Sequence, residues 1–268
     1  MWRFIVVAFI LINYKLVRAN SSEADVGTRV VNGTDAEDGE FPFIASLRKV
    51  VNVTGGSHSC GSSIISKRWL LTAAHCVAGR ESSSINIQYG VTEITSTGPN
   101  VASVEEIIVH EGYNPSDNYI NDIALLHLSA PLRLNDFINT IKLPKQGQVT
   151  RAGSDAVLVG WGLNASSGIV QTHLQKVDIK IFSDDDCQEL HNNGTHFTNI
   201  CAGVPGGGKG QCNGDSGGPL LVNGEQVGIV SWSVKPCTIA PYPGVFTKVA
   251  EYVNWIKSKA ELSDDYGE

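Results

Sequence analysis

The stretch Gly214-Asp215-Ser216-Gly217-Gly218-Pro219 decides how this 268-residue chain folds, because two motifs upstream complete it. Thr72-Ala73-Ala74-His75-Cys76 places a histidine beside a cysteine, and Asn121-Asp122-Ile123-Ala124-Leu125-Leu126 places an aspartate before an apolar run. A serine hydroxyl becomes a strong nucleophile only when a base removes its proton during attack. The chain supplies these side chains in the order histidine, aspartate, serine.

This order separates two kinds of serine hydrolase. The glycines around Ser216 also match the Gly-x-Ser-x-Gly pattern of esterases and lipases, in which the serine precedes both the acid and the histidine. No histidine follows Ser216 in this chain, so an esterase would lack its base. The order found here is that of the chymotrypsin triad.

On these three motifs the chain resembles the trypsin/chymotrypsin family of serine proteases, from Val30 to about Ala260, and within it the chymotrypsin-like enzymes of invertebrates. The resemblance implies an all-β fold of two six-stranded antiparallel β-barrels, with the active site between them and a C-terminal helix. It also implies a serine endopeptidase that needs no cofactor and no metal.

The resemblance assigns catalytic roles to named positions. His75 would be the general base, Asp122 would orient it, and Ser216 would attack the substrate. The backbone N–H groups of Gly214 and Ser216 would form the oxyanion hole, which stabilises the negative charge of the tetrahedral intermediate.

The N-terminal residues predict secretion. Arg3 precedes the apolar run Phe4 to Ile12, and small residues near Ala19 offer a cleavage point, so residues 1–19 read as a signal peptide. A membrane anchor is the alternative, but the run is shorter than the roughly 18 to 20 apolar residues that a span needs. We therefore expect an extracellular protein.

The resemblance makes residues 20–29 an activation propeptide and residues 30–268 the protease domain. Cleavage after Arg29 would free the amine of Val30, which the family pairs with the position of Asp215. A buried carboxylate needs such a partner to remain charged at acceptable cost. The chain should therefore be an inactive zymogen.

Six cysteines lie downstream of the signal segment, and an oxidising compartment favours disulfides among them. Their number alone allows 15 connectivities. The family resemblance implies the pairs Cys60–Cys76, Cys187–Cys201 and Cys212–Cys237, each worth about 3 kcal/mol in the chain-entropy model. Metal binding is the alternative use of cysteine, but the sequence has no Cys-x-x-Cys pair.

Short β-branched runs between turn residues predict strands, for example 85–89, 104–109, 156–159 and 227–230. One segment differs, because 250–262 spaces Val253, Ile256 and Ala260 as one face of an amphipathic helix.

The residues matching the family's substrate pocket predict specificity. Its floor matches Gly210, where trypsins carry an aspartate, so a Lys or Arg side chain would enter without a countercharge. With Ser233 and Gly244 as walls, the pocket should be deep and uncharged, and cleavage should follow Phe, Tyr or Leu. An elastase-like pocket is the alternative, and Ser233 should narrow the slot. Lys209 beside the floor is expected to point outward.

Other residues of the same resemblance line the cleft. Ser231 and Ser233 should pair with the substrate backbone as an extended strand. Trp232 should form a flat apolar wall, and Asn213 should lie at the lip of the pocket.

Charge and composition limit the partners. Without residues 1–29 the formal charge moves from −7 to −9, and no basic stripe is present, so nucleic acid is not expected. The expected partners are protein or peptide substrates, an activating trypsin-like protease, and protein protease inhibitors; we expect a monomer.

The absence of an appended domain favours digestion over a venom or cascade role.

Two further features can be judged from the sequence, namely glycosylation and calcium binding. Five Asn-x-Ser/Thr sequons occur, at Asn20, Asn32, Asn52, Asn164 and Asn193, and the last three are the candidates for glycosylation. The segment 89–98, which matches the calcium loop of some trypsins, holds one acidic residue, too few to supply the six or more oxygens that calcium prefers.

One alternative from another class remains, an inert homologue that acts by binding. Such proteins normally lose a triad residue or the oxyanion glycine, whereas this chain keeps His75, Asp122, Ser216 and Gly214.

Overall fold

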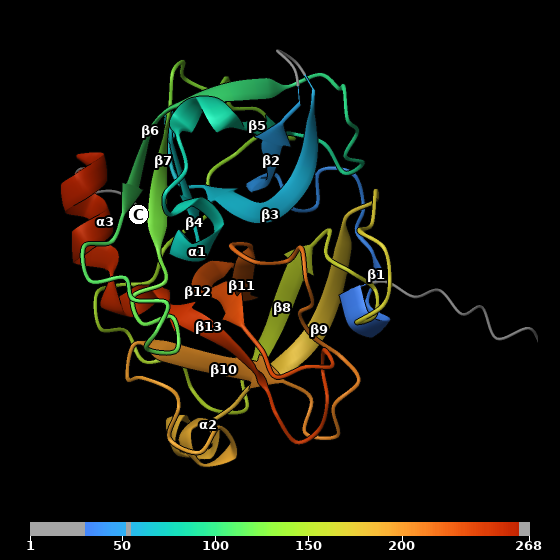
Figure 1. The fold of residues 1–268 in the computed structure, drawn as a ribbon, viewed down its shortest axis with the longest axis vertical. Coiled ribbons are helices and arrows are strands. Elements are labelled where there is room, and N and C mark those ends of the chain that lie inside the picture. The colour runs from blue at the N-terminus through green and yellow to red at the C-terminus, as the bar shows by residue number, and fades with distance from the viewer. Residues whose placement is uncertain (1–29, 52–54, 263–268) are drawn as a thin grey trace, which may run out of the picture.

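The computed structural model describes residues 30–51 and 55–262, and the short strands of this part of the chain close into two antiparallel barrels (Figure 1). The first barrel runs in the order β2-β3-β4-β7-β6-β5. Its strands are β2 (Ile44–Val50), β3 (Gly56–Ile64), β4 (Trp69–Thr72), β5 (Ile85–Tyr89), β6 (Val101–Val109) and β7 (Ala124–Leu128).

The second barrel is a ring of six strands, in which β8 closes the sheet by pairing with both β11 and β9. One further strand of two residues, β1 (Thr34–Asp35), extends the sheet at β9. The ring contains β8 (Asp155–Gly160), β9 (Gln175–Ile181), β10 (Asn199–Gly203), β11 (Pro219–Val222), β12 (Glu225–Trp232) and β13 (Gly244–Lys248). The prediction of two six-stranded barrels is therefore confirmed.

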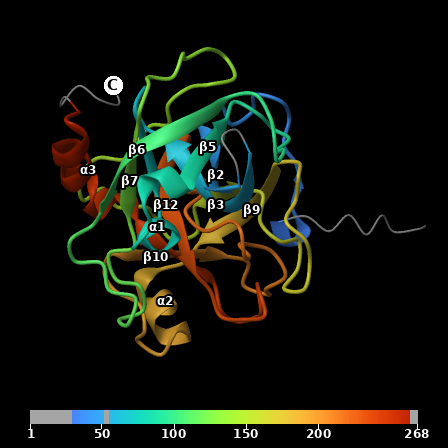
Figure 2. The ribbon, with the colours of Figure 1, turned by 45° about the horizontal axis from the view of Figure 1, so that its top comes forward.

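The helices of the described chain are short and lie outside the barrels. Figure 2 shows α2 at the lower end of the molecule, away from the first barrel. The α-helices are α1 (Ala74–Val77), α2 (Asp184–Leu190) and α3 (Val253–Ala260); the 3₁₀ turns are η1 (Val30–Asn32), η2 (Ser82–Ser84) and η3 (Val249–Glu251).

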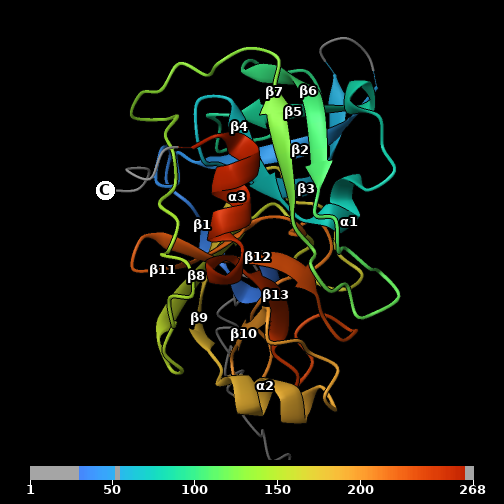
Figure 3. The same ribbon diagram turned by 90° about the vertical axis from the view of Figure 1, so that its left-hand side faces the viewer.

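The C-terminal helix forms where the sequence predicts it, although α3 is shorter than the predicted range because the 3₁₀ turn η3 precedes it. Its buried residues are Val253, Ile256 and Ala260, the three that the spacing selects. Two of them, Ile256 and Ala260, belong to a core cluster made mainly of first-barrel residues, and Figure 3 shows α3 beside the first barrel. The C-terminal helix, which follows the last strand of the second barrel, therefore packs against the first barrel.

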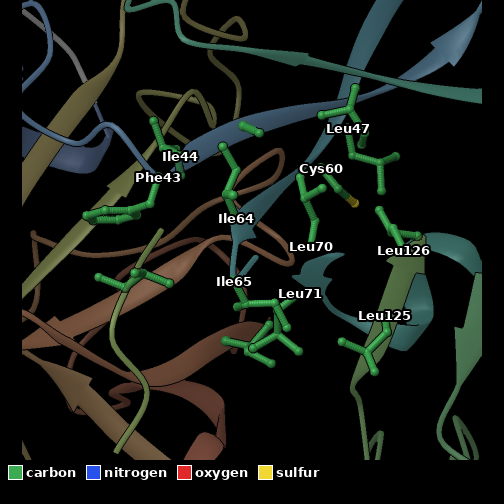
Figure 4. Packing of buried hydrophobic residues seen from close by; sticks show 14 of the residues in the cluster. Phe43, Ile44, Leu47, Cys60, Ile64, Ile65, Leu70, Leu71, Leu125 and Leu126 are labelled. Carbon is green, nitrogen blue, oxygen red and sulfur yellow. The ribbon is translucent and has the colours of Figure 1, made fainter. Parts of the chain in front are cut away.

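The core of the first barrel consists of aliphatic side chains from facing strands, among them Leu47, Ile64, Leu70 and Leu125, which are completely buried (Figure 4). Each such side chain contributes about 1.5–3 kcal/mol through burial. A rigid barrel of this kind fixes the strand ends from which the functional loops leave.

Candidate active site

The pairing of β4 with β7 brings the predicted histidine and aspartate together. Thr72, the last residue of β4, pairs with Ala124, the first residue of β7. His75 follows β4 in helix α1, and Asp122 precedes β7, so the two residues leave the barrel at the same end. The Nδ1 atom of His75 lies 2.7 Å from Oδ2 of Asp122. The backbone N–H of His75 also donates to Asp122 Oδ1, at 2.8 Å.

The Asp122 carboxylate is completely buried, and both barrels hold it. In addition to His75, the hydroxyl of Ser231 on β12 donates to Asp122 Oδ2 at 2.6 Å. The hydroxyl of Thr247 on β13 donates to the Asp122 backbone carbonyl at 2.8 Å. A fully bonded carboxylate can accept the Nδ1–H of the histidine, which leaves Nε2 as the atom free to take a proton.

Ser216 lies on the second barrel, in the turn before β11, and faces the same cavity as His75. This cavity has a volume of about 300 Å³. No hydrogen bond joins the two side chains within the described residues, as is common in triads without a substrate. The Ser216 carbonyl accepts from Gly61 N–H on β3 at 2.7 Å, so the nucleophile is anchored to the opposite barrel.

The predicted oxyanion hole has the backbone form that its role requires. Gly214 has φ +97°, a conformation that favours glycine, and a Cβ at this position would lie 3.0 Å from Gly162 Cα. Neither the N–H of Gly214 nor that of Ser216 donates to another group in the described part of the chain. Two such unpaired N–H groups can bind a developing oxyanion.

A residue that sequence reasoning missed supports this loop. His58 on β3 is half-buried, and desolvation by the surrounding protein lowers its pKa to about 4. Its Nε2 lies 2.9 Å from the Gly214 carbonyl, and its Nδ1 lies 2.8 Å from the hydroxyl of Ser46 on β2. A carbonyl only accepts, so Nε2 carries the proton and the ring is neutral. No local motif in the sequence marks His58, and only barrel closure brings it to Gly214.

Asp215 lies in a cradle lined by glycines. Its side chain is completely buried; Oδ1 accepts from Gly162 N–H at 2.8 Å, and Oδ2 accepts from Cys212 N–H at 2.9 Å. A Cβ at Gly160 or Gly162 would come within 2.3 Å of this carboxylate. Burial raises the pKa of Asp215 to about 7, although the two N–H bonds and the charge of Lys235 oppose the shift.

The N-terminal cut site lies outside the described residues, because these begin at residue 30. The 3₁₀ turn η1 packs near β9, and the Asn32 side-chain amide donates to the Gly208 carbonyl at 2.7 Å. The predicted signal peptide, propeptide and Arg29, as well as the sequon at Asn52, belong to the undescribed segments. No helix within residues 30–51 and 55–262 is long and apolar enough to span a bilayer.

The substrate pocket is shallower than the sequence predicts. The expected depth rested on the open space beside Gly244, but a Cβ there would lie 2.9 Å from Cδ of Gln211. The buried Gln211 side chain therefore fills that space, and its Nε2 donates to the Trp232 carbonyl at 2.6 Å. The space left beyond it, lined by Gly210 and Ser233 among others, is about 10 Å³.

The remaining predicted residues line the cleft. Ser231, Trp232, Ser233 and Asn213 all border the 300 Å³ cavity, whereas Gly210 and Gly244 line a separate, smaller space that shares Gln211 and Ser233 with it. Ser231 also has the side-chain contact with Asp122 that the sequence did not indicate.

The three implied disulfides are present, Cys60–Cys76, Cys187–Cys201 and Cys212–Cys237. The first ties α1, and so His75, to β3, and the third joins the two sides of the cleft near Asn213. The potential metal ligands Cys60, His75 and Cys76 cluster within the described residues, but the two cysteines are bonded to each other. This cluster therefore offers no thiolates for a metal.

Two predicted glycosylation sites lie in described loops. Asn193 is exposed, with φ +59°, in the turn after α2, and Asn164 is half-buried in the loop after β8.

A histidine backed by a buried carboxylate, and opposed across a cleft by a serine from a second barrel, defines the class of two-barrel serine hydrolases. Comparison with known proteins narrows this class, because residues 30–256 match the Trypsin family. Trypsin Blo t 3 of Blomia tropicalis is 40% identical over 236 residues, which cover 86% of this chain and 85% of that protein. The chain belongs to the trypsin family and is a serine endopeptidase.

Other relatives are also trypsins by name. Trypsin-1 of Astacus astacus is 38% identical over 241 residues, which cover 86% of this chain and 100% of that protein. Trypsin I-P1 of Gallus gallus is 36% identical over 233 residues, which cover 86% of this chain and 88% of that protein. Membership of the family makes proteins or peptides the substrates of this enzyme.

Proposed function

We propose that this endopeptidase is a secreted zymogen that is activated by cleavage after Arg29 and then hydrolyses peptide bonds after large apolar residues such as Phe, Tyr and Leu. The observation that carries the proposal is the 2.7 Å contact between His75 Nδ1 and Asp122 Oδ2, in the wall of the cavity that Ser216 also lines. This contact leaves Nε2 available on the side where a substrate binds.

The chemistry then follows acyl transfer. Ser216 Oγ attacks the scissile carbonyl carbon while His75 Nε2 takes the hydroxyl proton, and the N–H groups of Gly214 and Ser216 bind the oxyanion. The intermediate expels the amine, which receives the proton from His75, and leaves an acyl-enzyme. Water, deprotonated by His75, hydrolyses the acyl-enzyme and restores the serine. Asp122 holds the histidine tautomer throughout.

The lining of the cavity argues against a cationic side chain at the P1 position, the residue before the cleaved bond. No Asp or Glu lies among the residues that line it. A Lys or Arg side chain would thus lose water without gaining a countercharge, which costs several kcal/mol. Three relatives are named trypsins, and this chain has Gly210 where trypsins carry the acid. The amide of Gln211 shortens the pocket and favours Leu over Trp.

The environment of Asp215 supports the activation step. A buried carboxylate whose pKa is raised by desolvation gains more than an exposed one from a nearby cation. The ammonium of Val30 would be such a cation, and it exists only after cleavage. An enzyme that prefers apolar residues would not cut after Arg29, so activation requires another protease with trypsin-like specificity.

The test starts from purified zymogen that is cut with trypsin, with Val30 verified as the new N-terminus. Peptide anilides ending in Phe, Leu, Ala and Arg are then assayed before and after the cut, with Ser216→Ala and Arg29→Gln as controls. Hydrolysis after Phe or Leu that appears only after the cut supports the proposal. Preference for Ala indicates an elastase-like pocket, and preference for Arg contradicts the assignment of Gly210. No activity with a verified N-terminus favours the inert homologue.

A further inference from the structure

One charged side chain at the cleft has no part in the chemistry described above. Apart from His75, Lys235 is the only side chain that can carry a positive charge among the twelve residues that line the 300 Å³ cavity. It lies in the loop after β12, two residues before Cys237, whose disulfide to Cys212 fixes this loop against the loop that carries Ser216. Lys235 therefore places a positive charge at a defined position beside the nucleophile.

The contacts of Lys235 are with neutral groups. Its Nζ donates to Asn213 Oδ1 at 2.8 Å, and it lies 3.5 Å from Ser233 Oγ and 3.2 Å from Cys237 Sγ. No carboxylate within the described residues forms an ion pair with it. An ammonium has three donors, and a disulfide sulfur is a weak acceptor, so one donor remains for a stronger partner.

The surroundings increase the effect of this charge. Lys235 is an exposed residue, but burial of part of its side chain lowers its pKa, and the carboxylate of Asp215 opposes that shift. Charges interact more strongly near a protein surface than in bulk solvent. A carboxylate that enters the cavity is attracted, and a second cation is repelled.

We propose that Lys235 sets the charge selectivity of the substrate cavity, favouring a P1 side chain with a carboxylate over the matching amide and excluding Lys and Arg. The inference rests on the proposed function, because it takes this cavity as the site of the P1 side chain. It concerns polar side chains only and leaves the preference for Phe, Tyr and Leu in place. Asn213 acts as the support that directs the ammonium toward the substrate.

The test compares peptide anilides with Glu and Gln at P1, since these side chains have the same shape and differ in charge. Peptides with Leu and Arg at P1 complete the set. The variants are Lys235→Met, which keeps the length of the side chain without its charge, and Lys235→Glu, which reverses the charge. Lys67→Met is the matched control, because Lys67 is an exposed lysine in the β3–β4 turn, at the far end of β4 from His75.

In the activated enzyme we expect kcat/KM for the Glu peptide to exceed that for the Gln peptide by about fivefold at low salt. A fivefold ratio corresponds to about 1 kcal/mol, which is the value of a favourable exposed ion pair. Lys235→Met should bring the ratio to about one, and raising the salt to about 0.5 M should reduce the wild-type ratio. Lys235→Glu should raise the Arg/Leu ratio by about fivefold or more. Lys67→Met should leave both ratios unchanged.

A Glu/Gln ratio that is the same in wild type and Lys235→Met overturns this inference alone, provided that the Leu peptide is cut. Labelling of Ser216 with a phosphonate counts the active molecules, so a poorly folded variant does not distort the comparison. A wild-type enzyme that cuts none of the four peptides overturns the proposed function together with this inference.

Discussion

Replacing Gly162 by alanine tests whether the glycine cradle around Asp215 keeps the oxyanion loop in place. The new Cβ would lie 2.3 Å from Cγ and Oδ2 of Asp215 and 2.5 Å from Oδ1. Ordinary carbon contacts are about 3.5 Å or longer, so the carboxylate must move by roughly 1 Å. It cannot move that far and keep its bonds of 2.8 Å to Gly162 N–H and 2.9 Å to Cys212 N–H.

The size of the effect follows from those two bonds. Hydrogen bonds to a charged group contribute about 1.5–3 kcal/mol each, so weakening both should cost about 3 kcal/mol of unfolding free energy. For a domain of this size that corresponds to a fall in Tm of about 6–12 °C. Because Gly214 precedes Asp215 in the same loop, the oxyanion donor also moves, which typically lowers kcat about 10²–10³-fold.

The assay measures thermal unfolding and kcat of the activated Gly162→Ala enzyme on a Leu anilide. Gly206→Ala is the matched control, because Gly206 is exposed and a Cβ there would meet nothing within 4 Å. That control should stay within about 0.5 kcal/mol of wild type. A Gly162→Ala enzyme with the stability and kcat of the control would refute the reasoning that Asp215 holds the loop.

Three further predictions concern other groups near the site. His58→Leu should lower kcat about tenfold while KM changes little, because the part-buried Gly214 carbonyl loses its donor at a cost of about 1–2 kcal/mol. An unchanged kcat on Leu anilides would contradict this. Burial raises the pKa of Asp215 from 3.8 to about 7, so the folded uncut chain binds this proton more tightly than the unfolded chain, and its stability should fall between pH 4 and pH 7. Cleavage after Arg29 supplies the Val30 ammonium, which should remove this loss of stability. The difference in Tm between the cut and the uncut form should therefore grow from pH 4 to pH 7. A constant difference would argue against the pairing of Val30 with Asp215. Gln211→Ser should reopen the deep end of the pocket and raise the Phe/Leu ratio of kcat/KM about tenfold, whereas an unchanged ratio would show that the amide does not limit depth.

Local patterns were sufficient for several elements of the fold. Residues 85–89 form β5 as predicted, and the runs 104–109, 156–159 and 227–230 lie within longer strands. Such runs are recognisable because strand formation depends on β-branched residues between turns. The closure of the strands into two barrels came from the family resemblance, since pairing between distant strands leaves no local signal.

The pocket shows where sequence reasoning ended. Gly210, Ser233 and Gly244 line one small space, and its size depends on Gln211, which no motif marks. Lys235 was equally inconspicuous in the sequence, because its importance comes from its position beside Asn213. Side-chain packing across the barrel, and not residue type, sets the volume and charge of this cavity.

The sequence by itself determined the class of chemistry, because the order of His75, Asp122 and Ser216 within their motifs fits one kind of hydrolase. It also determined the amphipathic face of the C-terminal helix, since helix periodicity is local. Only the tertiary structure decided that His58 supports Gly214, that glycines enclose Asp215, and that Gln211 shortens the pocket. These contacts join residues far apart in the chain, and they exist only once both barrels have closed around them.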